Sequence, residues 1–310
     1  MLSFYDAIEC GQLLGRQSDG DNLHRFSTSP RPPATASLEH ARVVTRFGLG
    51  NPRLNQLFRH LILAHMNNVN ENYLDRVTAL PCTTVGHSGH SWETHGMSRH
   101  QTLALLAERL CAVAPGRPAL VAIDGFDGAG KTVLAQELVT LVLARGARPA
   151  INVSMDDFHH PRVHRYATGR GPESFYRASY DYDAFRRCVI TPLRTGHAIT
   201  PAVWDVDEDR PVDARPIKLA PDALVLVDGI FLHRPELRDE WDASVWVDVP
   251  FSVSVPRGNA RFPGEHDPDP EAEEHHRYVA GQRLYLAEAS PREAATWVLD
   301  NASLDRPRLS

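Results

Sequence analysis

Eight consecutive residues carry the clearest chemistry in the chain and have the pattern Gly-x-x-x-x-Gly-Lys-Thr: Gly125, Phe126, Asp127, Gly128, Ala129, Gly130, Lys131 and Thr132. An apolar run precedes them, and a helical pattern follows. This setting is typical of a loop whose backbone N–H groups surround phosphates at the positive end of a helix. Lys131 would reach the β- and γ-phosphates, and the Thr132 hydroxyl would bind Mg²⁺. The stretch therefore predicts a nucleotide site.

Two acidic positions follow apolar runs. Asp228 ends the run Leu224-Val225-Leu226-Val227, the pattern of an acid that holds Mg²⁺ or its water, although a carboxylate capping the next turn would look the same. Asp156 and Asp157 directly follow the run 150–154. A carboxylate there could orient an acceptor hydroxyl, whereas the alternative is a pair that caps a helix.

Arg257 and Arg261 are four residues apart after Pro256. Helical spacing would put both on one face, where they could close over phosphates and neutralise the transferring group. A solvated face is the alternative. The acidic, proline-containing stretch 265–274 that follows is expected to be a mobile loop, on the hinge side of a lid.

Aromatic side chains gather at Phe175, Tyr176, Tyr180 and Tyr182. Aromatic rings stack on nucleobases, but they also fill protein cores. The residue types leave both readings open.

The elements that must position these residues alternate in type. Ser98 and Gln101 form a capping-box pattern at the start of a helix. Helical patterns also follow Thr132 and run from Asp183 to about Thr195, whereas residues 159–180 read as irregular. Apolar strands are expected at 119–123, 150–154, 224–228, 245–249 and 297–300. Such alternation predicts an α/β fold with a mostly parallel sheet flanked by helices, whose ligands bind beyond the carboxyl ends of the strands.

The chain has 310 residues, a formal net charge of −6 and four scattered cysteines. The negative net charge gives no support to a nucleic-acid-binding surface, which is usually basic. The scattered cysteines are typical of reduced thiols in a cytoplasmic protein. No apolar run reaches the length of a membrane helix, and no secretory signal is apparent. We therefore expect small-molecule partners, no nucleic acid and no membrane, with a homo-oligomer left open.

Residues 1–96 differ in composition from the rest and are expected to be an extension, partly disordered or helical, ahead of one domain at 97–310. Residues 54–65 show helical spacing. Four histidines lie between His87 and His100, and their irregular spacing favours a solvated loop over a metal site.

From Ala119 onward the chain resembles the uridine kinase group of P-loop kinases, which includes phosphoribulokinase and pantothenate kinase. Besides the P-loop, the resemblance rests on four segments in the expected order: Ser154-Met155-Asp156-Asp157-Phe158, Tyr180-Asp181-Tyr182-Asp183-Ala184-Phe185, Trp204-Asp205-Val206-Asp207 through Arg210, and Val227-Asp228-Gly229-Ile230. The resemblance implies a P-loop three-layer sandwich. It also implies ATP- and Mg²⁺-dependent phosphoryl transfer to a primary hydroxyl, such as the 5′-hydroxyl of uridine or cytidine.

The resemblance also implies residue roles. Asp156 would be the general base, with Lys131, Arg257 and Arg261 acting on the phosphates. Thr132 and Asp228 would bind Mg²⁺. The substrate would contact residues of the aromatic and Trp204 segments: Tyr176, Asp181, Asp183, Trp204 and Arg210.

Three features of the sequence depart from the family pattern. His159 replaces a tyrosine, the Trp204 segment lacks a histidine, and the lid region is acidic. The acceptor is thus open to alternatives. One is a nucleoside monophosphate, since the P-loop is similar to that of thymidylate kinases, and another is a non-nucleoside metabolite. An ATP-binding module without catalysis is the alternative of another class.

Overall fold

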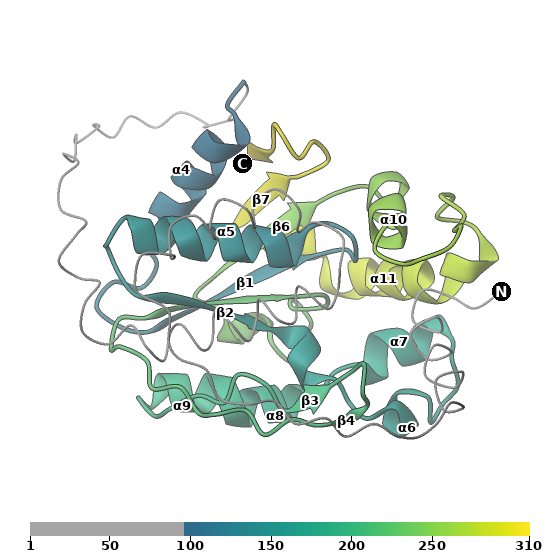
Figure 1. Ribbon diagram of the computed structural model, residues 1–310, viewed down its shortest axis with the longest axis horizontal. Coiled ribbons are helices and arrows are strands. Elements are labelled where there is room, and N and C mark those ends of the chain that lie inside the picture. Colours follow the sequence, from purple (N-terminus) through teal and green to yellow (C-terminus); the bar gives the residue numbers. More distant parts are fainter. Residues whose placement is uncertain (1–95) are drawn as a thin grey trace, which may run out of the picture.

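A computed structural model describes residues 96–310. At its centre lies a six-stranded sheet in the order β2-β5-β1-β6-β7-β8 (Figure 1). All neighbouring pairs are parallel except β7 and β8. The strands are β1 Ala119–Gly125, β2 Ala150–Ser154, β5 Leu224–Gly229, β6 Ala243–Asp248, β7 Trp297–Asp300 and β8 Arg308–Leu309. The predicted mostly parallel sheet is confirmed, and the short final strand β8 is an addition to it. The predictions for residues 54–65 and for most of the histidine tract lie outside the described residues.

Helices cover both faces of this sheet, which gives the three layers (Figure 1). The helices α4 (Arg99–Cys111) and α5 (Lys131–Ala144) pack on one face, against Val121 and Ile123 of β1. Leu120 and Ala122, which alternate with them, contribute to the core on the other face. That core includes side chains from α7 (Pro172–Ala178), α8 (Tyr182–Phe185), α9 (Thr191–Arg194) and α11 (His276–Ala289). Because β1 is buried on both faces, its sequence is almost continuously apolar.

The helix α4 begins with the predicted capping box. The Ser98 backbone N–H donates to Gln101 Oε1 over 2.9 Å, and the Gln101 N–H donates to Ser98 Oγ over 3.4 Å. Arg99 then joins α4 to α5 through Glu137, with the Arg99 Nη2 atom 2.7 Å from Glu137 Oε2. The start of the described fold is therefore fixed both by its own cap and by a contact with the helix that follows the P-loop.

The prediction of an irregular segment at 159–180 is wrong in part, because α6 (Arg162–Arg165) and α7 lie within it. The helix α7 is only seven residues long, and its stability comes from packing against α11. A Cβ atom at Gly281 of α11 would lie 2.7 Å from the Phe175 ring, so the two helices approach closely at a glycine. Such a contact between distant segments has no local sequence signal.

The helix predicted from Asp183 to about Thr195 is confirmed as a helical run from α8 to α9, with a π-helical segment, Arg186–Ile190, between them. The hairpin of β3 (Trp204–Asp205) and β4 (Arg210–Pro211) was not predicted, since two-residue strands give no periodic pattern. The helix α10 (Phe251–Asn259) ends before Arg261. The helical-spacing argument for Arg257 and Arg261 is therefore wrong.

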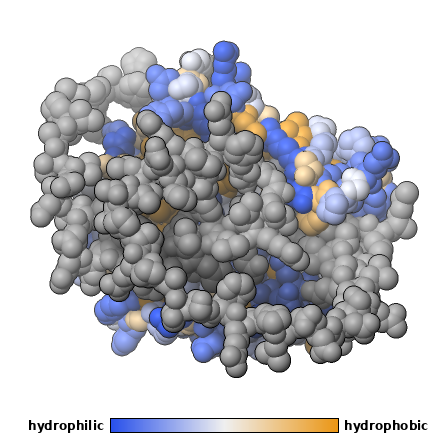
Figure 2. Space-filling model, viewed as in Figure 1, coloured by the Kyte–Doolittle hydropathy of each residue, from blue (hydrophilic) through white to orange (hydrophobic). Residues whose placement is uncertain are grey.

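The surface gives few signs of a large apolar contact area. The exposed large hydrophobic side chains among the described residues are scattered over separate segments: Val133, Leu143, Val163 and Leu304. Where the described surface is visible in Figure 2, it is largely hydrophilic, with small hydrophobic areas between. Among residues 96–310, no helix combines the length and the apolar character that a membrane span requires. Cys111 and Cys188 are free thiols, and the other two cysteines lie outside the described residues.

Candidate functional site

The P-loop connects β1 to α5 at the carboxyl edge of the sheet (Figure 1). Gly128 has a φ of +74°, and a Cβ atom there would lie 2.1 Å from the Ser254 carbonyl oxygen of α10. A larger residue would meet both a strained backbone and a steric clash with a neighbouring backbone atom. The loop is consequently shaped by direct packing against α10.

Lys131 is the first residue of α5, and its side chain is buried, with Nζ donating to the Phe126 carbonyl oxygen over 2.7 Å. Burial lowers the pKa of Lys131, and the nearby carboxylates of Asp127 and Asp156 partly oppose this shift. A buried ammonium group bent back over the loop, in a water-poor setting, is suited to an anionic ligand such as a phosphate chain.

The candidate metal site lies at the start of α5 and the end of β5. Thr132 Oγ1 donates to Asp228 Oδ2 over 2.6 Å, and Asn152 Nδ2 donates to Asp228 Oδ1 over 2.9 Å. The described residues contain no group of three or more His, Cys, Asp or Glu side chains able to hold a metal ion by themselves. The hydroxyl and carboxylate oxygens nevertheless fit Mg²⁺, which is usually bound by one or two carboxylates together with substrate phosphates and water.

Asp156 lies in the 3-10 turn Met155–Phe158, directly after β2. The Tyr180 hydroxyl donates to Asp156 Oδ1 over 2.9 Å. His159 Nδ1 lies 2.8 Å from the Asp156 carbonyl oxygen, and its ring centroid is 4.4 Å from that of Tyr180. Burial lowers the pKa of His159, so its neutral form is favoured. The Asp156 carboxylate is thus held in a fixed orientation by a buried aromatic residue.

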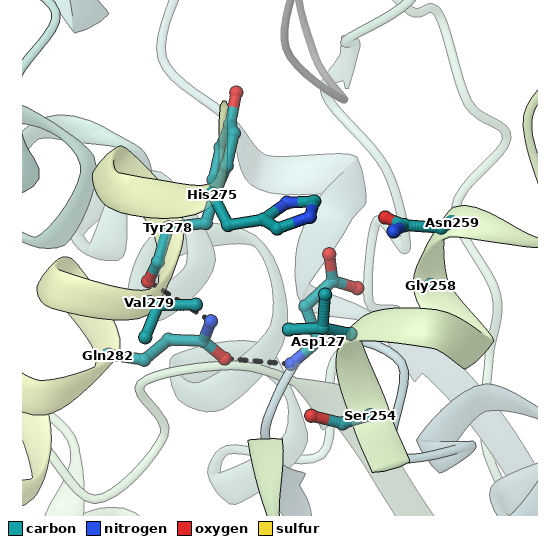
Figure 3. A pocket seen from close by; sticks show the side chains of 9 residues that line it. Asp127, Ser254, Gly258, Asn259, His275, Tyr278, Val279 and Gln282 are labelled. Carbon is teal, nitrogen blue, oxygen red and sulfur yellow. Dashed lines mark hydrogen bonds between the residues drawn. The ribbon is translucent and has the colours of Figure 1, made fainter. Parts of the chain in front are cut away.

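Asp127, within the P-loop, is contacted from the C-terminal part of the chain (Figure 3). Gln282 of α11 accepts from the Asp127 backbone N–H over 2.8 Å, and Arg261 Nη2 donates to Asp127 Oδ1 over 2.7 Å. Burial alone would raise the pKa of Asp127, but the charges of Arg261 and Lys131 outweigh it and lower the pKa. His275 and Asn259 line the pocket above this carboxylate (Figure 3).

Arg257 lies elsewhere. Its guanidinium donates to the carbonyl oxygens of Asn301, over 2.9 Å, and Ala302, over 2.6 Å. Asn301 in turn donates through Nδ2 to the Ala129 carbonyl oxygen over 2.9 Å. Arg257 therefore holds the segment after β7, and that segment supports the back of the P-loop, whereas Arg261 contacts the loop itself.

The five residues assigned to the substrate by resemblance occupy different environments. Tyr176 is 1% exposed in the core. The Asp181 carboxylate accepts from the Ala184 N–H over 2.7 Å at the start of α8, and the Asp183 side chain is 81% exposed. Arg210 is exposed on β4. Trp204 Nε1 is buried, with no hydrogen-bond partner among the described residues.

The Trp204 hairpin does lie near Asp156, since the Val203 N–H donates to the Asp157 carbonyl oxygen over 3.0 Å. Of the five assigned residues, Tyr176 and Trp204 each have a buried polar atom without a hydrogen-bond partner among residues 96–310, and Trp204 is the one next to a residue bonded to the segment of the candidate base.

A buried polar network beneath the P-loop was not predicted. Asp124, on β1, is fully buried and accepts from the Gly125 N–H over 2.7 Å and from the Tyr285 hydroxyl. His233 Nδ1 lies 2.7 Å from Asp124 Oδ2, and its Nε2 lies 2.9 Å from Ser244 Oγ. The Asp–His–Ser order resembles a hydrolytic triad, but all three side chains are buried in the core. We interpret the network as a support that fixes the end of β1.

Removal of one donor from this network should destabilise the fold. Tyr285→Phe is expected to lower the free energy of unfolding by about 1–3 kcal/mol, because the buried Asp124 carboxylate loses a hydrogen bond. Tyr182→Phe is the matched control, since the Tyr182 hydroxyl is buried without a partner among the described residues. Chemical denaturation measures both. An equal loss of stability in the two variants would contradict the role given to the Tyr285 hydroxyl.

Comparison with known proteins gives two informative relatives, although no family model matches the chain. A uridine kinase from Shewanella halifaxensis is 24% identical over 144 residues, which are 46% of this chain and 68% of that protein. The solved structure of a possible uridine kinase from Bacillus stearothermophilus matches with a TM-score of 0.53 and 23% identity, over 65% of this chain and 98% of that one. The expected resemblance to uridine kinase-like P-loop kinases is therefore confirmed, and the fold is the P-loop three-layer sandwich that this resemblance implies.

Proposed function

We propose that this chain, with its uridine kinase-like P-loop fold, is an ATP-dependent kinase that phosphorylates a hydroxyl group of a small molecule, and that residues 97–310 carry this activity. The observation that carries the proposal is the Asp156 carboxylate, which the Tyr180 hydroxyl orients over 2.9 Å. It lies near enough to Lys131 to influence that residue's pKa. A fixed carboxylate beside a P-loop lysine is what transfer to a hydroxyl requires.

The proposed reaction gives a role to each of the residues at the carboxyl edge of the sheet. The loop amides and Lys131 would bind the triphosphate, and Thr132 and Asp228 would hold Mg²⁺, which would neutralise charge on the phosphates. Asp156 accepts the proton of the acceptor hydroxyl while the oxygen of that hydroxyl bonds to the γ-phosphorus. The bond from that phosphorus to the β–γ bridging oxygen breaks, and ADP leaves.

Arg257 and Arg261 would have to change their present contacts to different extents in order to bind phosphate. Arg261 is already at the P-loop through Asp127, and phosphate oxygens can replace that carboxylate as its partner. A direct phosphate contact by Arg257 requires its guanidinium to leave the carbonyl oxygens of Asn301 and Ala302. We therefore assign the neutralisation of charge on the phosphates to Arg261 ahead of Arg257.

The nucleoside acceptor, uridine or cytidine, comes from the resemblance. Its support among the described contacts is limited to Trp204, because Tyr176 lies in the core and Asp183 faces solvent. A coupled ADP-release assay of the purified protein with ATP and Mg²⁺ tests the proposal. The acceptor panel covers uridine, cytidine, other nucleosides, nucleoside monophosphates, pantothenate, glycerate and sugars. We expect ADP release that depends on one class of acceptor. Tight ATP binding without acceptor-dependent release would favour a non-catalytic module.

A further inference from the structure

A small cavity lies beside the candidate base and shares one lining residue, Tyr278, with the pocket at the P-loop. His159, Arg165, Ser179 and Arg277 contribute to its lining, together with aromatic side chains. Its volume is about 10 Å³, which is room for about one water molecule. This space matches a single oxygen atom of a terminal group, and a nucleobase with its ribose is far too large for it.

Two guanidinium groups converge on this cavity with little carboxylate compensation. Arg165 is 5% exposed, and its nearest carboxylate oxygen, on Asp209, is 3.8 Å from Nη2. Arg277 donates through Nη1 to Ser174 Oγ over 2.7 Å and to the Gly171 carbonyl oxygen over 3.1 Å. Within residues 96–310, its Nε atom is buried without a hydrogen-bond partner, and no Asp or Glu side chain forms an ion pair with it. The buried charge of Arg165 is costly unless a counter-charge is supplied, and Arg277 brings a second positive charge to the same cavity.

His159 links the cavity to the candidate base Asp156. That imidazole forms part of the lining, and its Nδ1 atom lies 2.8 Å from the Asp156 carbonyl oxygen. Aromatic rings on the other side hold Arg277, whose guanidinium carbon is 5.0 Å from the centroid of the Tyr166 ring and 5.6 Å from that of Phe175. A molecule with its hydroxyl at Asp156 could thus place its far end between the two arginines.

We propose that the phosphoryl acceptor carries an anionic group, a carboxylate or a phosphate, which binds between Arg165 and Arg277. This inference rests on the proposed kinase function and narrows its acceptor. It disfavours uridine and cytidine, which are uncharged, and favours hydroxy acids or phosphorylated hydroxyl compounds. Guanidinium groups suit either anion, because their planar N–H pairs match carboxylate and phosphate oxygens.

The test is calorimetric titration of the full chain, with a non-hydrolysable ATP analogue and Mg²⁺ saturating the P-loop. The anionic probes are D-glycerate and inorganic phosphate, and glycerol is the neutral match. We expect at least one anion to bind and glycerol not to bind. In Arg277→Gln the affinity for that anion should fall by about 10- to 100-fold. Binding of D-glycerate alone indicates a carboxylate acceptor, and binding of phosphate alone indicates a phosphorylated one.

Two further variants separate charge from structure. Arg277→Lys keeps the charge and should retain more affinity than Arg277→Gln. Arg283→Gln removes an exposed arginine of the same helix, one that pairs with Glu271, and should bind as the wild type does. Thermal unfolding of each variant establishes that it is folded.

The inference is overturned if neither anion binds, or if the anion binds Arg277→Gln as well as the wild type. It is also overturned if uridine is phosphorylated with the same kcat/KM by the wild type and Arg277→Gln, while the kinase proposal then stands. If no acceptor supports ADP release, the kinase proposal fails, and the anion titration still decides whether the cavity is an anion site.

Discussion

Asp156→Asn should lower acceptor-dependent phosphoryl transfer by about 10²- to 10⁴-fold, the usual contribution of a general base. Asparagine has nearly the same shape and can still accept a hydrogen bond from Tyr180, but it cannot take the proton of the acceptor hydroxyl. ATP affinity should stay within a few-fold, because Lys131 and the loop amides carry nucleotide binding. A coupled ADP-release assay measures turnover, and calorimetry with a non-hydrolysable analogue measures binding.

Asp157→Asn is the matched control for this substitution, since it makes the same chemical change one residue away. It should keep turnover close to that of the wild type. Unchanged turnover in Asp156→Asn, or equal losses in the two variants, would contradict the assignment of Asp156 as the base.

Lys131→Ala should weaken ATP binding by about 10- to 100-fold, as expected when a charge-assisted hydrogen bond to phosphate is lost. The ammonium group is buried among acidic side chains, and its removal leaves Asp127 and Asp156 to repel the incoming phosphates. Transfer should fall with it. Titration with the ATP analogue measures the effect, and Lys218→Ala, at an exposed position, serves as the control. Wild-type affinity in Lys131→Ala would refute this nucleotide site.

The residues of the proposed phosphate site could be predicted from the sequence because each follows a local pattern. The Gly-x-x-x-x-Gly-Lys-Thr motif, Asp156 after β2 and Asp228 at the end of β5 are all marked by a short apolar run beside a functional residue. A parallel sheet then brings the ends of those runs to the same edge, as the strand order confirms.

The remaining features depend on contacts between distant segments. Asp124, His233, Ser244 and Tyr285 come from four separate parts of the chain, and none has a neighbour in sequence that reveals its partner. The same is true of Arg165 and Arg277, which line one cavity although they lie on α6 and α11. Single-sequence patterns report local periodicity, and they therefore indicated the proposed phosphate site but not the cavity beside Asp156.

The placement of arginines shows the same limit. Four-residue spacing suggested that Arg257 and Arg261 share a helical face, but α10 ends at Asn259. Arg257 consequently holds the segment at Asn301 and Ala302, and Arg261 reaches the P-loop. The position of the last helical residue decided whether the two arginines share a face. Helix boundaries are among the features that a single sequence predicts least well.

The central claim, transfer of the γ-phosphoryl group of ATP to a hydroxyl compound oriented by Asp156, is tested most directly by mass spectrometry of the reaction mixture. Wild-type protein is incubated with ATP, Mg²⁺ and the acceptor panel, in parallel with Asp156→Asn. We predict that one acceptor gains a single phosphoryl group, in amounts equal to the ADP formed, and that this product is nearly absent with Asp156→Asn. ADP without a phosphorylated acceptor, or the same product in equal amounts from both proteins, would contradict the claim.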